Sequence, residues 1–259
     1  MSDDFEIRGN VKLKVRDAIA HVRLNRPDRL NALDRAMVYD LAEALEGLVA
    51  RSDLRVIVIG GEGRAFCAGG DLAPFAANEG RSDDVVDALL PRLHELLILL
   101  SQAPQAVVFS VHGTAAGAGM SLSFMGDFCI AADNAQFVPA YAGIGLTPDG
   151  GGTVGLVRAL GPRQALRLLL AEDRFPATLA HSMGLVTRLV PEAELGAETL
   201  AFARRLARLD PGAVAGTRRL VMQSSGRDLA AQLETEMAEL KQRMRSDTFR
   251  SAVRRFADA

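Results

Sequence analysis

Apolar and polar residues alternate in two short stretches near the start of the chain, at 11–15 and 19–24. Such alternation is typical of β-strands with one buried face, and Pro27 then prevents further ladder pairing. The two stretches predict a β-hairpin. Apolar residues recur every three or four positions from Met37 to Leu48, which predicts a helix with Asp34 as its cap.

A short, wholly apolar run at 56–59 is typical of a strand buried on both faces, and glycines follow it directly. The same order of strand, glycines and helix recurs further along, which predicts an α/β fold. From Pro191 onward the chain has a helical, Arg-rich pattern, so we divide it into a core, 1–190, and a C-terminal helical region, 191–259. The pattern predicts further helices at about 84–101, 118–125, 154–160, 163–170 and 177–183, and further strands at 106–111 and 128–131.

The composition is that of an ordinary globular protein, with 259 residues, of which 49% are hydrophobic and 24% charged. A net charge of −2 gives no reason to expect nucleic acid or an anionic membrane as a partner. Cys67 and Cys129 have neither disulfide nor metal-ligand spacing, so we expect no metal. The N-terminal stretch 1–10 is polar, unlike a signal peptide, and no apolar run is long enough to span a bilayer. We therefore expect a cytoplasmic protein.

Two glycine-rich loops follow predicted buried strands, at 60–71 and 112–119. Neither matches the glycine motifs that bind nucleotide phosphates. Glycine tolerates positive φ and lets backbone N–H groups approach a ligand closely, so two such loops can direct two N–H groups at one oxygen. That arrangement suits an oxyanion. Tight strand-to-helix turns would also use glycine, and either loop alone leaves that alternative open.

A series of segments resembles the crotonase (enoyl-CoA hydratase/isomerase) superfamily in order and spacing, over nearly the whole chain. The resemblance implies an acyl-CoA thioester as substrate and a spiral of repeated ββα units. It also implies a C-terminal helical region that forms homotrimers, often paired as homohexamers. The segments are NRP at 25–27 with NAL at 31–33, GRAFCAGGDL at 63–72, GTAAGAG at 113–119, Asp127 with Asp133, and GLTPDGGG at 145–152.

The resemblance also implies roles for individual residues. The backbone N–H groups of Ala68 and Ala118 would be the two oxyanion donors. The remaining loop residues would line the groove for coenzyme A and the acyl group. These expected contacts are Arg29, Ala32, Ala68, Gly69, Gly70, Asp71, Leu72, Gly117, Ser121 and Tyr141.

The two glutamates of true enoyl-CoA hydratases are absent, because Ser121 and Tyr141 occupy their positions. Neither replaces a carboxylate in moving the protons of a hydration, so ordinary hydration is disfavoured. Ser121 and Tyr141 are instead expected to orient the substrate. Asp149, held between a proline and a glycine run, can remove and return a proton, unless it only caps the helix after Gly152. The segment around Asp149 is similar to ring-1,2-epoxyphenylacetyl-CoA isomerases of phenylacetate degradation.

The sequence thus favours an acyl-CoA isomerase that needs no metal or redox cofactor. One alternative is a hydratase or thioester hydrolase that works without the usual glutamates. Another is a degenerate relative that binds coenzyme A esters, or supports an assembly, without turnover. Loss of both glutamates agrees with this last alternative, whereas the retained Asp149 and both glycine loops argue against it.

Overall fold

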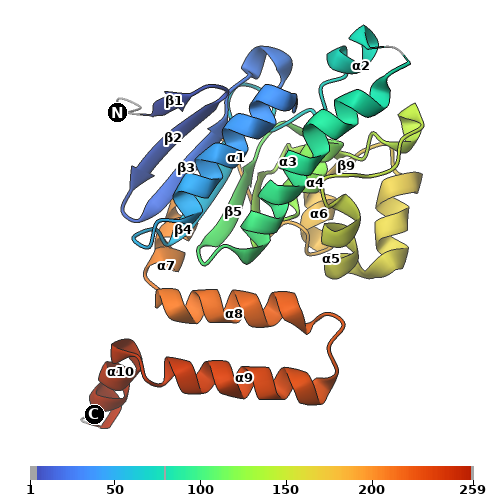
Figure 1. The fold of residues 1–259 in the computed structure, drawn as a ribbon. Helices are drawn as coiled ribbons and strands as arrows, with labels where there is room; N and C mark the ends of the chain where they lie inside the picture. Colours follow the sequence, from blue (N-terminus) through green and yellow to red (C-terminus); the bar gives the residue numbers. More distant parts are fainter. Residues whose placement is uncertain (1–4, 79, 258–259) are drawn as a thin grey trace.

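The structure is a computed structural model that describes residues 5–78 and 80–257 (Figure 1). Residues 1–4 of the polar N-terminal stretch therefore lie outside the described residues. Within the described part, strands form a 7-stranded sheet in the order β1-β2-β3-β4-β5-β7-β10 and a 3-stranded sheet in the order β6-β8-β9. The α/β prediction is confirmed.

The N-terminal hairpin is confirmed as β2 (Val11–Arg16) and β3 (Ile19–Leu24), which pair antiparallel. The predicted buried strand is β4 (Val56–Gly61), which pairs parallel with β3 and with β5 (Ala106–Val111). All six residues of β4 are buried, because helices cover both faces of the sheet there.

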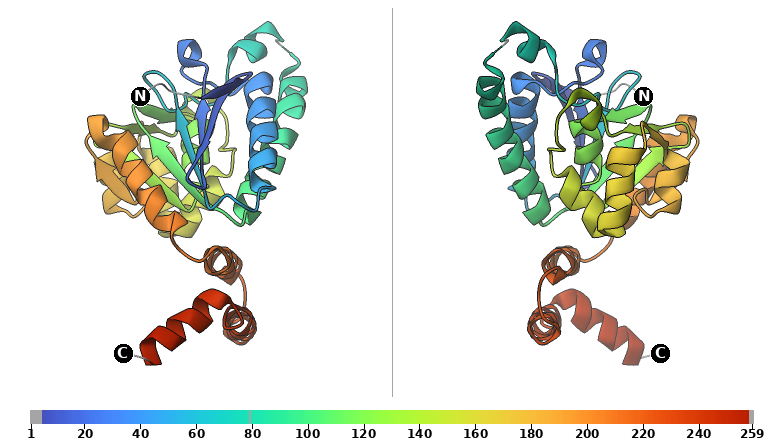
Figure 2. Two further views of the ribbon diagram at one scale, coloured as in Figure 1. Left: turned by 90° about the vertical axis from the view of Figure 1, so that its left-hand side faces the viewer. Right: turned by 90° about the vertical axis from the view of Figure 1, so that its right-hand side faces the viewer.

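Helices α1 (Arg35–Val49) and α3 (Ser82–Gln102) cover one face of the large sheet, and α7 (Leu195–Ala207) covers the other (Figure 2). The Asp34 carboxylate accepts a hydrogen bond from the Met37 N–H at 2.8 Å, so the predicted cap of α1 is confirmed. The apolar sides of these helices and the strands between them form one continuous core.

The remaining elements are short, except for α5, and most of them follow the first glycine loop. The predicted break at Gly161 is confirmed, because this residue has φ 76° and interrupts the helical backbone. The elements are α2 (Ala73–Ala77), β6 (Thr114–Ala116), α4 (Ala118–Ser123), β7 (Phe128–Ala132), β8 (Gln136–Val138), α5 (Gly152–Leu166), a π-helical turn (Arg167–Ala171), β9 (Phe175–Pro176), α6 (Ala177–Ser182) and β10 (Arg188–Val190), with 3-10 turns at Pro27–Arg29, Ala142–Ile144 and Glu192–Glu194.

The sequence patterns do not predict several short strands. β1 (Glu6–Arg8) lies in the stretch that was described only as polar, and β6, β8 and β9 have two or three residues each. Strands this short carry too few residues for alternation to be recognised. The partners of β9 also come from a distant part of the sequence, with Phe175 opposite Phe137.

The C-terminal region is helical, but its first helix is part of the core. Helix α7 packs against β3, β4, β5 and β7, and α8 (Pro211–Ser224) still contacts β5. α9 (Leu229–Arg243) packs on α8, and α10 (Asp247–Ala257) follows (Figure 1). The division at 190 therefore falls before a helix that the core sheet needs.

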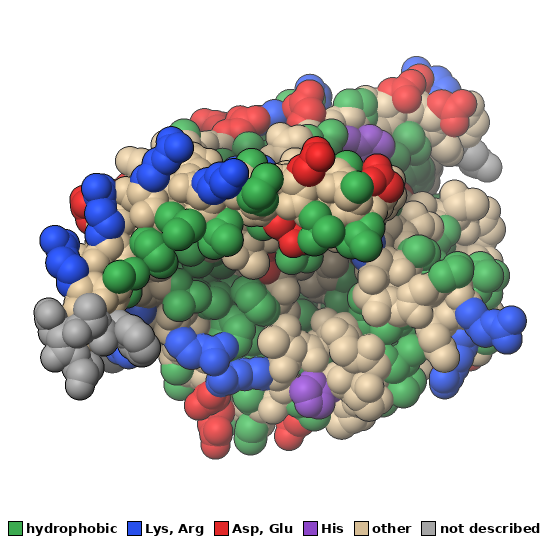
Figure 3. All heavy atoms as spheres, turned by 90° about the horizontal axis from the view of Figure 1, so that it is seen from below, with side chains coloured by type: hydrophobic (Ala, Val, Ile, Leu, Met, Phe, Trp, Pro, Cys, Tyr) green, Lys and Arg blue, Asp and Glu red, His purple; other side chains and the backbone are tan. Residues whose placement is uncertain are grey.

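Helices α8–α10 expose many apolar side chains. Seen from below, hydrophobic residues gather on the face where these helices lie (Figure 3). No helix among the described residues is long and apolar enough to cross a membrane. The exposed apolar residues of this region are Val221, Leu229, Leu233, Met237, Leu240, Met244, Phe249 and Val253.

His21 on β3 makes the stability of the fold depend on pH. Burial, followed by the nearby positive charges of Arg23, Lys14 and Arg204, lowers its pKa from 6.5 to about 4. Between pH 4 and 6.5, His21 is protonated in the unfolded chain but neutral in the folded one. Stability is therefore greatest above pH 6.5 and falls towards pH 4, by about 2 kcal/mol after allowance for partial solvent exposure.

Urea unfolding of wild type and of His21→Gln between pH 4 and 7 tests this expectation. The variant should lose the part of the slope that lies between pH 4 and 6.5. An equal pH dependence in both proteins would assign the effect to other groups.

Candidate functional site

The two glycine loops lie side by side and hold each other by hydrogen bonds. The Cys67 N–H donates to the Thr114 carbonyl at 3.2 Å, and the Ala116 N–H donates to the Cys67 carbonyl at 2.9 Å. These bonds come from loops that are more than 40 residues apart in sequence, so only folding brings them together.

The assignment of Ala68 as an oxyanion donor is wrong. Its N–H donates to the Leu30 carbonyl at 2.9 Å and is not available to a ligand. Two residues later, the exposed Gly70 has an N–H without an acceptor among the described residues. The N–H of Ala118, which begins α4, also has no acceptor in the described part of the chain. Gly70 and Ala118, rather than Ala68 and Ala118, therefore present the unpaired N–H groups.

Gly69 allows these two N–H groups to approach each other. It has φ +95°, and a Cβ built on it would lie 2.8 Å from the Ala116 carbonyl oxygen and 3.4 Å from the Ala118 nitrogen. A side chain at Gly69 would therefore separate the loops, and L residues rarely adopt this backbone conformation. Such a pair of N–H groups can stabilise negative charge on a carbonyl oxygen.

We expect Gly69→Ala to lower by at least about tenfold the kcat of a reaction that uses this pair of N–H groups, since displacing one oxyanion donor weakens charge stabilisation in the transition state. Turnover of the acyl-CoA thioester that the resemblance implies, together with the Tm, measures the effect. Gly196→Ala is the matched control, because a Cβ at Gly196 meets nothing within 4 Å and should leave kcat unchanged. Equal kcat values for the two variants would contradict a role for the close approach of the loops.

Asp149 is held against α4 by the glycines that follow it. Gly150 has φ +57°, and a Cβ there would lie 3.3 Å from Ser121 Cβ and 3.6 Å from the Ala118 carbonyl oxygen. A side chain at Gly152 would overlap the Ser121 hydroxyl. The glycine run therefore places the half-buried Asp149 beside the start of α4, where the Ala118 N–H lies.

Tyr141 and Ser121 bind Asp149. The Tyr141 hydroxyl donates to Asp149 Oδ1 at 2.6 Å and lies 2.9 Å from the Ser121 hydroxyl. Ser121 is fully buried and Tyr141 is nearly so, whereas both were expected to orient the substrate. Burial, and then the hydrogen bond to and charge of Asp149, raise the pKa of Tyr141 well above its ordinary value of 10. Tyr141 is therefore a neutral hydrogen-bond donor and not a base.

The alternative that Asp149 caps the next helix is not observed. The N-cap of α5 is Gly151, and no side chain bonds to the first turn of that helix. Asp149 contributes only its backbone carbonyl there, which accepts from the Gly152 N–H at 3.0 Å. Its carboxylate remains available beside α4.

Comparison with known proteins identifies the family that this geometry belongs to. Residues 14–259 match the family described as enoyl-CoA hydratase/isomerase. The chain belongs to this family. It is 36% identical over 248 residues to a Rhodobacter capsulatus protein named "Probable enoyl-CoA hydratase", covering 96% of this chain and 95% of that one.

Two further relatives confirm the crotonase fold and the range of reactions in the family. The chain is 32% identical over 243 residues to 1,2-epoxyphenylacetyl-CoA isomerase of Escherichia coli, with 93% of each chain covered. A crystal structure of an enoyl-CoA hydratase from Polaromonas sp. JS666 superposes with a TM-score of 0.90 at 32% identity, with 96% of each chain covered. Because the names include both hydratase and isomerase, family membership alone does not select one reaction.

Asp71, at the end of the first glycine loop, is a structural residue. Its carboxylate accepts from the Ala73 N–H at 3.0 Å and pairs with Arg26 at 3.1 Å. Burial alone would raise the pKa of Asp71, but these hydrogen bonds and the positive charges of Arg26 and Arg29 lower it. Arg26 also pairs with Asp34 at 3.1 Å and donates to the Ala32 carbonyl at 2.7 Å.

Arg26 is the residue that the sequence reasoning missed here, although it lies inside the recognised NRP segment at 25–27. Only its tertiary contacts show that it ties the first glycine loop to the start of α1. Arg29, Gly70 and Leu72 are exposed beside it and are accessible to a ligand, whereas Ala32, Gly69 and Gly117 have little exposed surface.

An apolar cavity of about 260 Å³ lies next to the Gly70 segment, beneath α2 and against α3. Phe75 and Leu89 line it, whereas Leu93, one turn further along α3, is buried in the core. Leu33, which also lines the cavity, pairs with Gly70, so the cavity begins at the segment that carries one unpaired N–H.

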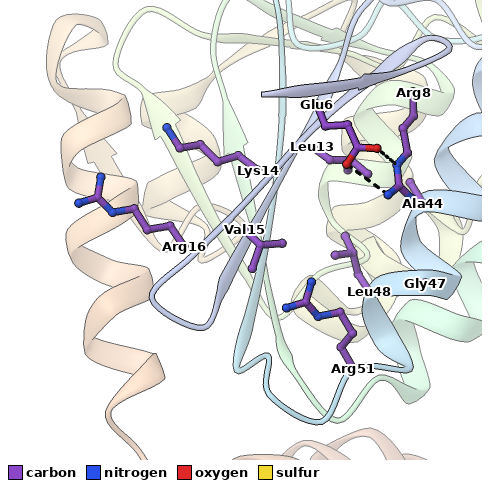
Figure 4. Close-up of a pocket in the computed structure, with 10 residues that line it drawn as sticks. All are labelled: Glu6, Arg8, Leu13, Lys14, Val15, Arg16, Ala44, Gly47, Leu48 and Arg51. Carbon is purple, nitrogen blue, oxygen red and sulfur yellow. Dashed lines mark hydrogen bonds and ion pairs between the residues drawn. The ribbon is translucent and has the colours of Figure 1, made fainter. Parts of the chain in front are cut away.

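A larger cavity of about 740 Å³ lies elsewhere, between α1 and the N-terminal hairpin (Figure 4). Its walls include Leu13, Val15 and Leu48, with the Glu6–Arg8 ion pair at one end. None of its lining residues comes from the glycine loops or from the Asp149 loop. Size alone therefore does not mark the site in this protein.

Buried groups near the loops have structural roles. Burial raises the pKa of the Cys67 thiol to about 12, which keeps it protonated and excludes it as a nucleophile at neutral pH. The His112 side chain bonds to the Gly63 carbonyl at 2.8 Å through Nε2. Asp149 is therefore the carboxylate that the loop geometry leaves beside the unpaired N–H groups.

Proposed function

We propose that this protein is an acyl-CoA isomerase that moves a double bond along an acyl chain through an enolate. One observation carries the proposal. The Asp149 loop packs on the residue that presents the second unpaired N–H, Ala118, while neutral Ser121 and Tyr141 stand where hydratases have glutamates. The site therefore combines one base with an oxyanion-binding pair.

The proposed reaction consists of two proton transfers. The Gly70 and Ala118 N–H groups bind the thioester carbonyl oxygen, and Asp149 removes a proton from C2 of a 3-enoyl-CoA. The electrons of the broken C–H bond form a dienolate, whose negative oxygen the two N–H groups stabilise. Asp149 then returns the proton to C4, which gives the 2-enoyl-CoA. All steps are proton movements, so this reaction needs no metal or redox cofactor.

Hydration would need more groups than this site offers. Water must be positioned and must lose a proton to a base while the substrate carbon gains one. Tyr141 has a raised pKa and already donates to Asp149, so it cannot serve as that second base at neutral pH. These contacts favour isomerisation over hydration or thioester hydrolysis.

The apolar cavity beside Gly70 supports an apolar acyl group, and similarity to 1,2-epoxyphenylacetyl-CoA isomerase supports including ring-containing esters among the substrates. We also propose that α8–α10 contact other copies of the chain in a homotrimer or homohexamer. The apolar residues that these helices expose support this assembly. Sedimentation at several protein concentrations measures it.

Incubation with a panel of 3-enoyl-CoA esters tests the proposed function. Ultraviolet absorbance follows conjugation of the double bond, and chromatography identifies products and any free coenzyme A. Formation of 2-enoyl-CoA supports the proposal. Accumulation of 3-hydroxyacyl-CoA or free coenzyme A would instead support a hydratase or hydrolase, and tight ester binding without any product would support a binding protein.

A further inference from the structure

We infer that Tyr141, oriented by Ser121, is a positioning residue that commits Asp149 to a single oxygen, Oδ2, as its base. The inference rests on the proposed function and goes beyond it, because it assigns the two residues at the glutamate positions a role towards Asp149. It starts from the chain of hydrogen bonds that joins Ser121, Tyr141 and Asp149.

The direction of each hydrogen bond follows from counting protons. A carboxylate only accepts hydrogen bonds, so the single proton of the Tyr141 hydroxyl is donated to Asp149 Oδ1. The Tyr141 oxygen then accepts the proton of the Ser121 hydroxyl, at 2.9 Å. Ser121 thus fixes the rotation of the phenol hydroxyl, and Tyr141 fixes the rotation of the carboxylate.

This series of hydrogen bonds ends inside the protein. The Ser121 hydroxyl is fully buried, and among the described residues Tyr141 is its only side-chain or backbone partner. A side chain in place of Gly152 would occupy the Ser121 hydroxyl position, so the loop closes over it. A proton therefore cannot leave Asp149 through Tyr141 and Ser121 to bulk water.

One oxygen of Asp149 is left to react. Oδ1 accepts the Tyr141 hydrogen bond, whereas Oδ2 accepts no hydrogen bond within the described residues. The proton taken from the substrate is held on Oδ2 and returned from the same atom. Since Tyr141 stays protonated, its hydroxyl keeps donating to Oδ1 and leaves Oδ2 to take the next proton.

A measurement on the resting enzyme tests the contact without turnover. The chain has two tyrosines and no tryptophan, so ¹³C labelling of tyrosine Cζ gives two NMR signals, from Tyr39 and Tyr141. Asp149→Ala, which removes the acceptor, should move the Tyr141 signal and leave the signal of the exposed Tyr39 in place. An unmoved Tyr141 signal would overturn the inference, whatever the enzyme catalyses.

Kinetics test the positioning role. Tyr141→Phe keeps the ring and should lower kcat about 10- to 100-fold, the loss expected for a hydrogen bond to a charged group, with KM within about twofold. Ser121→Ala, which leaves Tyr141 less constrained, should lower kcat by a smaller factor.

Tyr39→Phe is the matched control and should change neither kcat nor KM. A Tyr141→Phe enzyme with wild-type kcat, or one in which only KM changes, overturns the inference. If Tyr141→Phe fails to fold, as judged by its Tm, then kcat of Ser121→Ala and the NMR signal of Tyr141 test the inference instead.

Exchange of the C2 proton of acyl-CoA esters in D₂O separates this inference from the proposed function. Exchange without double-bond migration refutes the isomerase, while the exchange rates of the same variants still decide the role of Tyr141. Absence of both exchange and migration refutes both the proposed function and the inference.

Discussion

Replacing Asp149 with asparagine should lower kcat for 3-enoyl-CoA conversion by about 100- to 10,000-fold, which is the usual contribution of a positioned general base. Asparagine keeps the shape of the side chain and can still accept the Tyr141 hydrogen bond through its amide oxygen. It cannot take up the substrate proton. Initial rates over a range of ester concentrations measure the loss.

Binding of the ester should survive this change, because the Gly70 and Ala118 N–H groups and the apolar cavity are untouched. Calorimetric titration with a saturated acyl-CoA measures that binding. Asp173→Asn, at an exposed position, serves as the control and should retain wild-type kcat. Full activity of the Asp149→Asn enzyme would assign the base to another group.

Replacing Arg218 with methionine should destabilise the protein by about 3–5 kcal/mol, since it leaves a buried charge without its partner. The Arg218 side chain on α8 pairs with Asp127 at 2.6 Å, and both side chains are about one-tenth exposed. Arg218 also donates to the backbone carbonyls of Leu100 and Ala103 at the end of α3. This residue therefore ties the C-terminal helices to the core.

Urea unfolding of the variant measures this effect, and a second change on the partner identifies its cause. Asp127 also accepts from the Val107 N–H at 2.7 Å and so holds the start of β5. Adding Asp127→Asn keeps that acceptor, removes the buried charge and should recover part of the lost stability. Breaking the exposed Arg51–Asp53 pair with Arg51→Gln should leave the unfolding midpoint unchanged. Equal losses for Arg218 and Arg51 would contradict the explanation.

The sequence by itself determined the local elements and the family. The hairpin, the helix capped by Asp34 and the break at Gly161 depend on neighbouring residues, whose spacing and backbone preferences can be seen in the sequence. The glycine loops and Asp149 were also found there, because they follow strands in a fixed order. Family membership, suspected from these segments, is shown by the match over residues 14–259.

Only the tertiary structure decided which backbone N–H groups are available to bind a ligand. Successive N–H groups of the first loop face different neighbours, and Ala68 faces the Leu30 carbonyl, which lies 38 residues earlier in the numbering. A resemblance between sequences fixes a loop to within a residue or two, whereas a hydrogen bond depends on the direction of one N–H.

The same reason explains the partners of Asp149 and the anchor of α8. Tyr141 lies 8 residues from Asp149, and Arg218 lies 91 residues from Asp127. In both cases the sequence supplied residues of suitable chemistry but not their contacts. Those contacts form because α4 packs against the glycine run and α8 packs against the core. Such packing brings together residues that no local sequence pattern relates to each other.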